Sequence, residues 1–504
     1  MTTSVVSATV YHLSHFSINY RNMSQNVSHR HAPEGDHVLT AFEGVVGAAN
    51  LLATAEDMAR YLVDARGRYR GAALCVVRPA NTAEVAATVA ICARAGIAIV
   101  PQGGNTGMCG GATPGAQGRS VVISLERMRS IREVDPANST ITVDAGCPLA
   151  AVQEAASEIG KLFPLSLGSE GTCQIGGNIA TNAGGTAVLR YGPMRDLVMG
   201  IEAVLPDGRI WNGLRGLRKD NTGYDLKHLF IGSEGTLGIV TGAVLKLFSQ
   251  PAASAVALVA LPDVRAALAL LERIRCEFGE RVTTFEVMSD SEYQLVLALR
   301  TELRSPLAGQ TPWYAFIELT DAIEALDLQT ALAETLGEVM EAGGVNDATL
   351  AESGAQAENI WHIRHSVTEA NLKAGAAVSH DTSVPVSRVP EFVAGVEDGI
   401  RTRFPDAKSY FVGHIGDGNI HAIAIFPREK FSNPQRFAEV AGEVNALVDE
   451  VTVSLGGSVS AEHGIGRSNR ARLQRHKDPI ELEFMRQIKR VFDPAGLMNP
   501  GILL

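Results

Sequence analysis

The chain has 504 residues, which is too long for one hydrophobic core and predicts two or three domains. Hydrophobic residues make up 46% and charged residues 20%, a globular balance, and no apolar run approaches the ~20 residues that a membrane-spanning helix needs. The formal net charge of -11 disfavours nucleic acid as the main partner, because binding to a phosphate backbone needs clustered Lys and Arg.

The N-terminal residues 1–40 are predicted to be a disordered or targeting extension. Residues 1–33 lack acidic side chains, are rich in Ser and contain Arg21 and Arg30, a composition like that of a mitochondrial transit peptide. The favoured interpretation is a disordered tail, or a true start at Met23. We therefore expect a cytoplasmic protein, or one of the mitochondrial matrix if the extension is a transit peptide. The six cysteines have no regular spacing, which predicts reduced thiols rather than a disulfide framework.

The first predicted elements form a β-α-β unit. Apolar residues 74–77 and 97–100 predict strands on either side of a helix over 83–94. Residues 149–160 predict another helix and residues 198–211 a hairpin. Glycine-rich loops separate these elements, and clustered glycine indicates backbone that turns sharply or approaches a ligand closely.

A different pattern begins after Pro251. Strands are predicted over 255–261, 282–288 and 313–319. Helices are predicted over 264–278 and 325–342. This β-α-β-β-α order lacks glycine loops and predicts an α+β domain. The later predicted elements are a helical stretch over 355–374, a strand near 409–412 and a last helix over about 480–492.

Three glycine-rich loops, at 101–107, 164–185 and 231–240, are the first functional signal. The first loop directly follows a strand, so its consecutive N–H groups can face one anion. It has no lysine and is not a Walker A motif, and it lacks the G-x-G-x-x-G pattern of a Rossmann site. Three such loops in this order predict a large flat ligand that carries phosphates.

On these loops the chain resembles the FAD-binding domain of the vanillyl-alcohol oxidase superfamily, in the subgroup of D-lactate, glycolate and D-2-hydroxyglutarate dehydrogenases. The resemblance runs from about residue 70 to the C-terminus. It implies an α+β fold with a two-subdomain FAD-binding domain over 41–250. A ferredoxin-like α+β substrate cap domain that carries a metal site would follow over 251–475. A C-terminal helical segment over 476–504 would return to the flavin.

The resemblance also implies which residues bind FAD, without a covalent bond. In the family the first loop holds the pyrophosphate, the second passes under the flavin and the third closes over the adenine side. Carried over, the cofactor residues are Pro101, Gly103, Gly104, Asn105, Thr106, Gly107, Pro164, Gly168, Ser169, Gly177, Asn178, Thr181, Glu234, Gly238, Ile239 and Asn499.

A histidine motif in the C-terminal half is the second functional signal. His414 and His421 stand seven apart across a glycine loop and can converge on one cation, and Glu462 can supply a third ligand. Two imidazoles and a carboxylate with open positions are typical of a catalytic divalent metal, with zinc as the first candidate. The same pattern matches the metal motif of the resembled dehydrogenases. There the histidine after the glutamate faces the substrate, which makes His463 the predicted catalytic base.

The substrate residues are carried over from the same family. Arg364 and Thr368 stand four apart, so they would share one face of a helix, and Arg binds carboxylates with two parallel bonds. The chain departs from the D-2-hydroxyglutarate enzymes at Ser379, where a lysine is common, and at Ile423, where an asparagine is common. These losses favour a shorter or more apolar acid, although His380 could partly replace the missing charge.

We therefore predict an FAD- and metal-dependent dehydrogenase that oxidises a small D-2-hydroxy acid, D-lactate-like in size, by hydride transfer to flavin N5. D-2-hydroxyglutarate dehydrogenase is one alternative. An FAD-dependent alcohol oxidase that uses oxygen and a flavoprotein subunit of a glycolate oxidase-type complex are two more. The expected partners are an anionic 2-hydroxy acid and an external electron acceptor (an electron-transfer flavoprotein, a quinone or a cytochrome), with a homodimer as one option.

Overall fold

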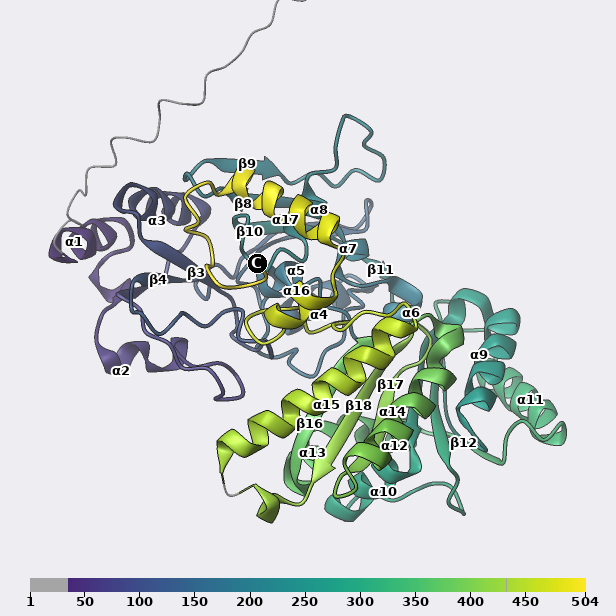
Figure 1. Ribbon diagram of the computed structural model, residues 1–504. Helices are drawn as coiled ribbons and strands as arrows, with labels where there is room; N and C mark the ends of the chain where they lie inside the picture. The colour runs from purple at the N-terminus through teal and green to yellow at the C-terminus, as the bar shows by residue number, and fades with distance from the viewer. Residues whose placement is uncertain (1–34, 432) are drawn as a thin grey trace, which may run out of the picture.

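The computed structural model describes residues 35–431 and 433–504. Residues 1–34 of the predicted extension lie outside the described residues, whereas helix α1, Gly35–Val46, already begins within the predicted range 1–40. Figure 1 shows an N-terminal domain, residues 35–250, at the upper left and the cap domain at the lower right. Among the described residues, no helix is both long and apolar enough to cross a bilayer.

The N-terminal domain is built on two sheets around one core that contains Ile99, Val121, Ile141 and Ile201. The first sheet has the order β1-β2-β4-β3, with bounds Leu51–Leu52, Cys75–Val77, Ser120–Ser124 and Ala98–Gln102. The second is antiparallel in the order β5-β6-β10-β8-β9, with bounds Ile131–Asp135, Thr140–Asp144, Ile239–Lys246, Val198–Val204 and Ile210–Gly213. A short pair of strands, β7 Lys161–Leu162 and β11 Phe248–Ser249, adds to them.

Helix α3, Thr82–Ala95, connects the parallel strands β2 and β3 and follows the expected end signals. The Asn81 side chain accepts the Glu84 N–H at its start, and Gly96 takes the left-handed conformation (φ 64°) at its end. The other helices of this domain are short: α2 Ala55–Met58, α4 Leu149–Ser157, α5 Ile175–Ala180, α6 Val188–Tyr191, α7 Met194–Leu197 and α8 Lys227–Phe230.

The cap domain is a seven-stranded antiparallel sheet in the order β15-β12-β14-β13-β17-β18-β16. The strands are β12 Ala253–Leu261, β13 Val282–Ser289, β14 Trp313–Asp321, β15 Asp347–Leu350, β16 Ala376–Ser383, β17 Lys408–His414 and β18 Asn419–Phe426. The first four strands, with helices α9 and α11 between them, form the β-α-β-β-α-β unit of a ferredoxin-like fold. Strands β17, β18 and β16 extend that unit beyond β13.

Helices cover both faces of this sheet. One face packs against α9 Val264–Phe278, α11 Leu328–Glu341, α14 Val389–Arg403 and α15 Pro434–Ser454. The other packs against α10 Asp290–Leu299, α12 Gly354–His365 and α13 Val367–Ala374. No helix was predicted over α14 or α15.

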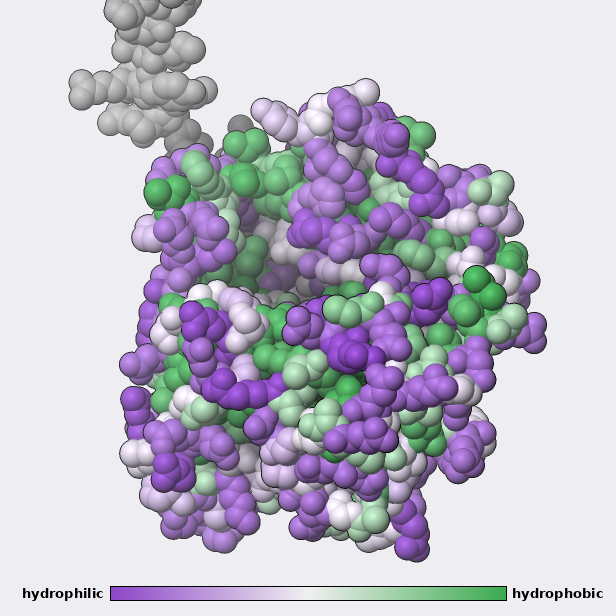
Figure 2. Space-filling view, turned by 90° about the vertical axis from the view of Figure 1, so that its right-hand side faces the viewer, coloured by the Kyte–Doolittle hydropathy of each residue, from purple (hydrophilic) through white to green (hydrophobic). Residues whose placement is uncertain are grey.

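The C-terminal segment returns to the N-terminal domain before α16, Arg470–His476, because the backbone N–H of Arg467 donates to the Cys109 carbonyl, and Figure 1 shows α16 beside α5. Helix α17, Pro479–Phe492, packs Ile488 and Phe492 on the N-terminal core, and the buried Met498 lies beside Ile99 of β3. Between the two domains the molecule is hollowed, and many residues on the walls of the hollow are apolar (Figure 2).

Candidate active site

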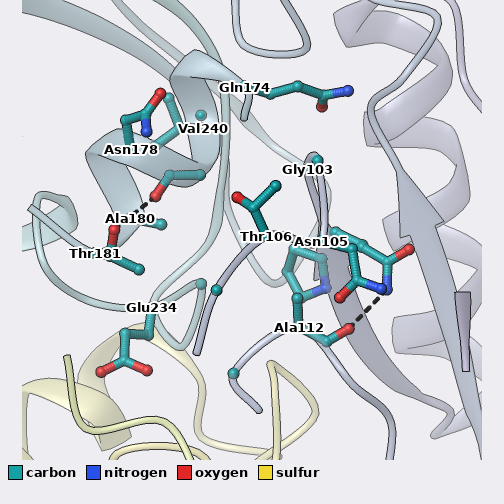
Figure 3. A pocket seen from close by; sticks show the side chains of 18 of the residues that line it. Gly103, Asn105, Thr106, Ala112, Gln174, Asn178, Ala180, Thr181, Glu234 and Val240 are labelled. Carbon is teal, nitrogen blue, oxygen red and sulfur yellow. Dashed lines mark hydrogen bonds between the residues drawn. The ribbon is translucent and has the colours of Figure 1, made fainter. Parts of the chain in front are cut away.

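A cavity lies where the three predicted loops meet, and residues of all three loops line it. Figure 3 shows Asn178, Thr181 and Glu234 on one side of this cavity and Gly103 and Thr106 on the other. The predicted cofactor residues that line it are Pro101, Gly103, Gly104, Asn105, Thr106, Gly107, Gly177, Asn178, Thr181, Glu234, Gly238 and Ile239.

The remaining predicted cofactor residues lie outside the lining. Pro164, Gly168 and Ser169 belong to the loop that precedes α5, and the Ser169 carbonyl accepts the backbone N–H of Cys173. The Asn499 side chain donates to the carbonyls of Gly111 and Glu234, two lining residues. Asn499 therefore supports the cavity wall from behind.

The cavity lining fits a flavin dinucleotide. A Cβ on Gly104 would lie 2.1 Å from the Thr172 carbonyl oxygen, so only glycine lets the first loop pack this tightly on the second. Asn105 takes a left-handed conformation (φ 54°), and its side chain donates to the Val63 carbonyl, away from the loop. Two lining side chains keep buried oxygens without a partner, Gln174 Oε1 and Asn178 Oδ1. Such acceptors need donors, which the flavin ring and ribityl chain carry.

The predicted metal residues converge at the cap domain. His414 ends β17 and His421 lies on β18, across a tight turn in which Gly418 has φ 80°, and Glu462 lies in the loop after α15. His421 Nε2 lies 3.4 Å from Glu462 Oε1, and His414 Nε2 lies 3.8 Å from Glu462 Oε2. The ligand atoms of all three lie within 4.8 Å of one another. Burial opposes ionisation of Glu462, but hydrogen bonds from His421 and His463 hold its pKa well below the usual range.

A carboxylate that the sequence did not single out, Glu286 on β13, lies behind this cluster. It is fully buried, and its Oε1 lies 2.7 Å from His414 Nδ1. Its Oε2 accepts a hydrogen bond from Arg364 Nε. Burial alone would raise the pKa of Glu286, but Arg364 and His414 outweigh burial and hold it at about 2. Burial also opposes a charge on His414, yet Glu286 raises the pKa of that imidazole to about 9.

His463 lines the cavity and connects it with the metal cluster. Its Nε2 lies 3.3 Å from Glu462 Oε1, and its Nδ1 lies 3.3 Å from Asp381 Oδ2. Asp381 also accepts the backbone N–H groups of Glu462 and His463. The loop is held from the other side by Glu234, whose two oxygens accept the N–H groups of Ile465 and Gly466 at 2.8 Å each.

The predicted substrate residues do not all lie together. Arg364 lies in α12 and is paired with Glu286, whereas Thr368 lies in α13, beyond a break at Ser366, and is exposed. His380 faces away from the metal cluster: Nε2 lies 2.8 Å from Asn445 Oδ1 of α15 and Nδ1 lies 3.1 Å from the Ala422 carbonyl oxygen. Burial lowers the pKa of His380 to about 4, so the ring is neutral near pH 7. The expectation that His380 replaces a missing positive charge is therefore wrong.

Two residues of the site could have been suspected from local patterns. Glu286 is the one ionisable residue in the apolar run 285–288 of a predicted strand, and a buried carboxylate needs a partner. Asp381 alternates with His380 along β16 and so points to the opposite face. The partners of both residues come from distant parts of the chain, which no local pattern identifies.

Comparison with known proteins agrees with this geometry. A model of the FAD binding domain matches residues 73–213, and one of the C-terminal domain of FAD linked oxidases matches residues 250–503. The chain belongs to the FAD-linked oxidase family. It is therefore an FAD-dependent oxidoreductase, and the resemblance seen in its loops is confirmed.

The relatives extend over most of the chain. It is 37% identical over 468 residues to the mitochondrial D-2-hydroxyglutarate dehydrogenase of Bos taurus, covering 92% of this chain and 83% of that protein. It is 36% identical over 469 residues to the D-2-hydroxyglutarate dehydrogenase of Xanthomonas citri pv. viticola, covering 93% and 97%. The p-cresol methylhydroxylase structure superposes with a TM-score of 0.73 at 16% identity, covering 92% of this chain and 96% of that one. Alkyldihydroxyacetonephosphate synthase gives 0.71 at 18% identity over 93% and 85%. These structures confirm the expected α+β fold class.

Proposed function

We propose that this flavoprotein oxidises a D-2-hydroxy acid to the 2-oxo acid and passes the electrons to an external acceptor. The proposal depends on one observation, the convergence of His414, His421 and Glu462 beside His463, which lines the loop cavity. The names of the bovine and Xanthomonas relatives make D-2-hydroxyglutarate the first substrate to test.

The three converging side chains suit a divalent cation. Two imidazole nitrogens and one carboxylate oxygen, with room for further ligands, are typical of catalytic zinc and related ions. When bound, the ion would supply Lewis acidity at the substrate hydroxyl, and FAD would supply the two-electron acceptor.

The protein side chains bind the acid and take its proton. The two terminal nitrogens of Arg364 have no partner among the described residues, so they are free to bind the substrate carboxylate. His463 faces Asp381 with Nδ1, which favours the tautomer that carries the proton on that nitrogen. His463 Nε2 lies 3.3 Å from Glu462 Oε1, and it would be the base that takes the hydroxyl proton when Glu462 binds the metal ion and no longer accepts a proton from this ring.

A shorter or more apolar 2-hydroxy acid is the second candidate substrate. Ser379 of β16 lies directly opposite Ile423 of β18, and both belong to the strand face that carries Asp381 and His421. The two departures from the D-2-hydroxyglutarate enzymes are therefore neighbours, and they make this part of the site less polar. A comparison of D-2-hydroxyglutarate with D-lactate tests which acid the site prefers.

The experiment is a dye-reduction assay of the purified protein with D- and L-2-hydroxy acids, before and after removal of metal with a chelator. We expect turnover of D-isomers only, loss of turnover on chelation and recovery when a divalent metal is added. His414→Ala should abolish turnover and keep the protein yellow. His362→Ala, an exposed residue of α12, is the matched control. Full activity after thorough metal removal would contradict the proposal.

The two remaining alternatives give different results in the same assay. An oxidase would form hydrogen peroxide rapidly without dye, whereas a subunit of a larger complex would show no turnover as a single chain. The electron acceptor, an electron-transfer flavoprotein, a quinone or a cytochrome, stays a prediction, as does a homodimer.

A further inference from the structure

Glu286 is a buried carboxylate that contacts both the metal cluster and the substrate arginine. One oxygen lies 2.7 Å from His414 Nδ1, and the other accepts the Arg364 Nε–H. The residue itself is 0% exposed. Glu286 belongs to β13, which pairs with β17 next to His414, and Arg364 comes from α12 on the same face of the sheet.

Stability alone does not explain this arrangement. Removing two charges from water costs several kcal/mol per ion, and replacing a buried ion pair by apolar residues is often neutral or stabilising. The neighbours of Glu286 on this face, such as Met288 and Phe316, are fully buried and apolar. An apolar side chain would fit the same core, so the carboxylate is better explained by what it does to its two partners.

We propose that Glu286 is a positioning residue that sets metal affinity and substrate binding together. This inference rests on the proposed function. Glu286 Oε1 lies 2.7 Å from His414 Nδ1, so the carboxylate favours a proton on Nδ1 and makes Nε2 the nitrogen that would lose its proton to a metal ion. His414 Nε2 is the ring nitrogen that lies near Glu462, 3.8 Å from its Oε2. By holding Arg364 through Nε, Glu286 fixes the plane of the guanidinium and leaves the two terminal nitrogens for the substrate carboxylate.

The chain offers a matched control in Glu292. It lies on α10, directly after β13, and is 0% exposed like Glu286, but it forms no ion pair among the described residues. Burial raises the pKa of Glu292 to about 8, so a glutamine imitates its neutral form. Glu292→Gln removes from the same region a buried carboxyl that forms no ion pair with His414 or Arg364, and because the pKa of about 8 leaves this carboxyl neutral near pH 7, the substitution changes no charge beside Arg364.

The test compares Glu286→Gln, Glu286→Asp and Glu292→Gln with the wild-type holoenzyme. Zn²⁺ affinity is measured by competition with a chelator, and KM and kcat with D-2-hydroxyglutarate. Flavin content shows whether each variant has folded. We expect Glu286→Gln to bind Zn²⁺ roughly 10- to 100-fold more weakly, to raise KM and to retain FAD, whereas Glu292→Gln matches the wild type.

Two outcomes separate this inference from the proposed function. If the wild type binds no Zn²⁺, the proposed function fails. If it does bind Zn²⁺ and folded Glu286→Gln binds it equally tightly, the positioning role is overturned. Should Glu286→Gln lose its flavin, Glu286→Asp decides, because it keeps the charge but is too short to reach both partners. We expect it to weaken Zn²⁺ binding as well, and wild-type affinity in that variant would overturn the inference.

Discussion

Two glutamates six residues apart, Glu286 and Glu292, show how the environment decides the charge of a buried side chain. Both are fully buried. Glu286 has Arg364 and His414 beside it and a pKa of about 2, whereas burial raises the pKa of Glu292 to about 8. The same residue type is therefore ionised in one position and neutral in the other at pH 7.

The Glu292 carboxyl predicts a pH dependence of stability. Its folded pKa of about 8 exceeds the ordinary value of 4.5, so between these values the unfolded chain loses a proton that the folded chain keeps. Stability therefore falls with rising pH in this window, by up to about 1.4 kcal/mol per pH unit. Glu292→Gln should remove this slope, so that its gain over the wild type grows from about pH 5 to about pH 8. Urea midpoints at both pH values check this, and an equal difference at the two would contradict it.

At the scale of elements, the close packing of the first glycine-rich loop on the second keeps the cofactor cavity in shape. The Cβ of an alanine at position 104 would lie 2.1 Å from the Thr172 carbonyl oxygen, so the loop after β3 would have to move. Gly104→Ala should weaken FAD binding by about 2 kcal/mol, or roughly 30-fold. Flavin content and FAD titration of the apoprotein measure the change. Gly115→Ala, which has open space around its Cβ, is the control and should keep its flavin.

The same scale shows what local patterns can predict. Helix α9 follows a clear helical period, strand β12 is a continuous apolar run, and the predicted β-α-β-β-α order agrees with the α+β architecture of the cap domain. The orientation of β16 was not predictable, because a shift by one residue exchanges His380 and Asp381 between the faces of the sheet.

The sequence predicted the candidate site only where the residue types and their spacing match a metal-binding pattern. The spacing of His414, His421 and Glu462 suggested their convergence. The contact of Glu286 with His414 depends instead on the pairing of β13 with β17, where Val287 lies opposite Gly413. Long-range strand pairing is decided by packing of the whole sheet and leaves no local trace in either segment.

At the scale of the molecule, the site depends on how the cap domain is joined to the FAD-binding domain. Glu234 precedes β10 in one domain, and its carboxylate accepts the N–H groups of Ile465 and Gly466 next to His463 in the other. Burial raises the pKa of Glu234, and these two N–H groups oppose that effect. These two hydrogen bonds hold the backbone that follows His463, and so they position the His463 side chain at the wall of the cavity.

This junction predicts a variant that keeps the cofactor and loses rate. Glu234→Gln has the same shape, but its amide nitrogen would face a backbone N–H and cannot accept from it. The loop should shift, and because a displacement of about 1 Å can cost 100-fold, we expect kcat to fall at least about 10-fold with little change in flavin content. Glu318→Gln, a substitution on β14, is the control. Stopped-flow reduction of the flavin by substrate measures the rate directly, and a wild-type rate in Glu234→Gln would mean that His463 is positioned by the cap domain alone.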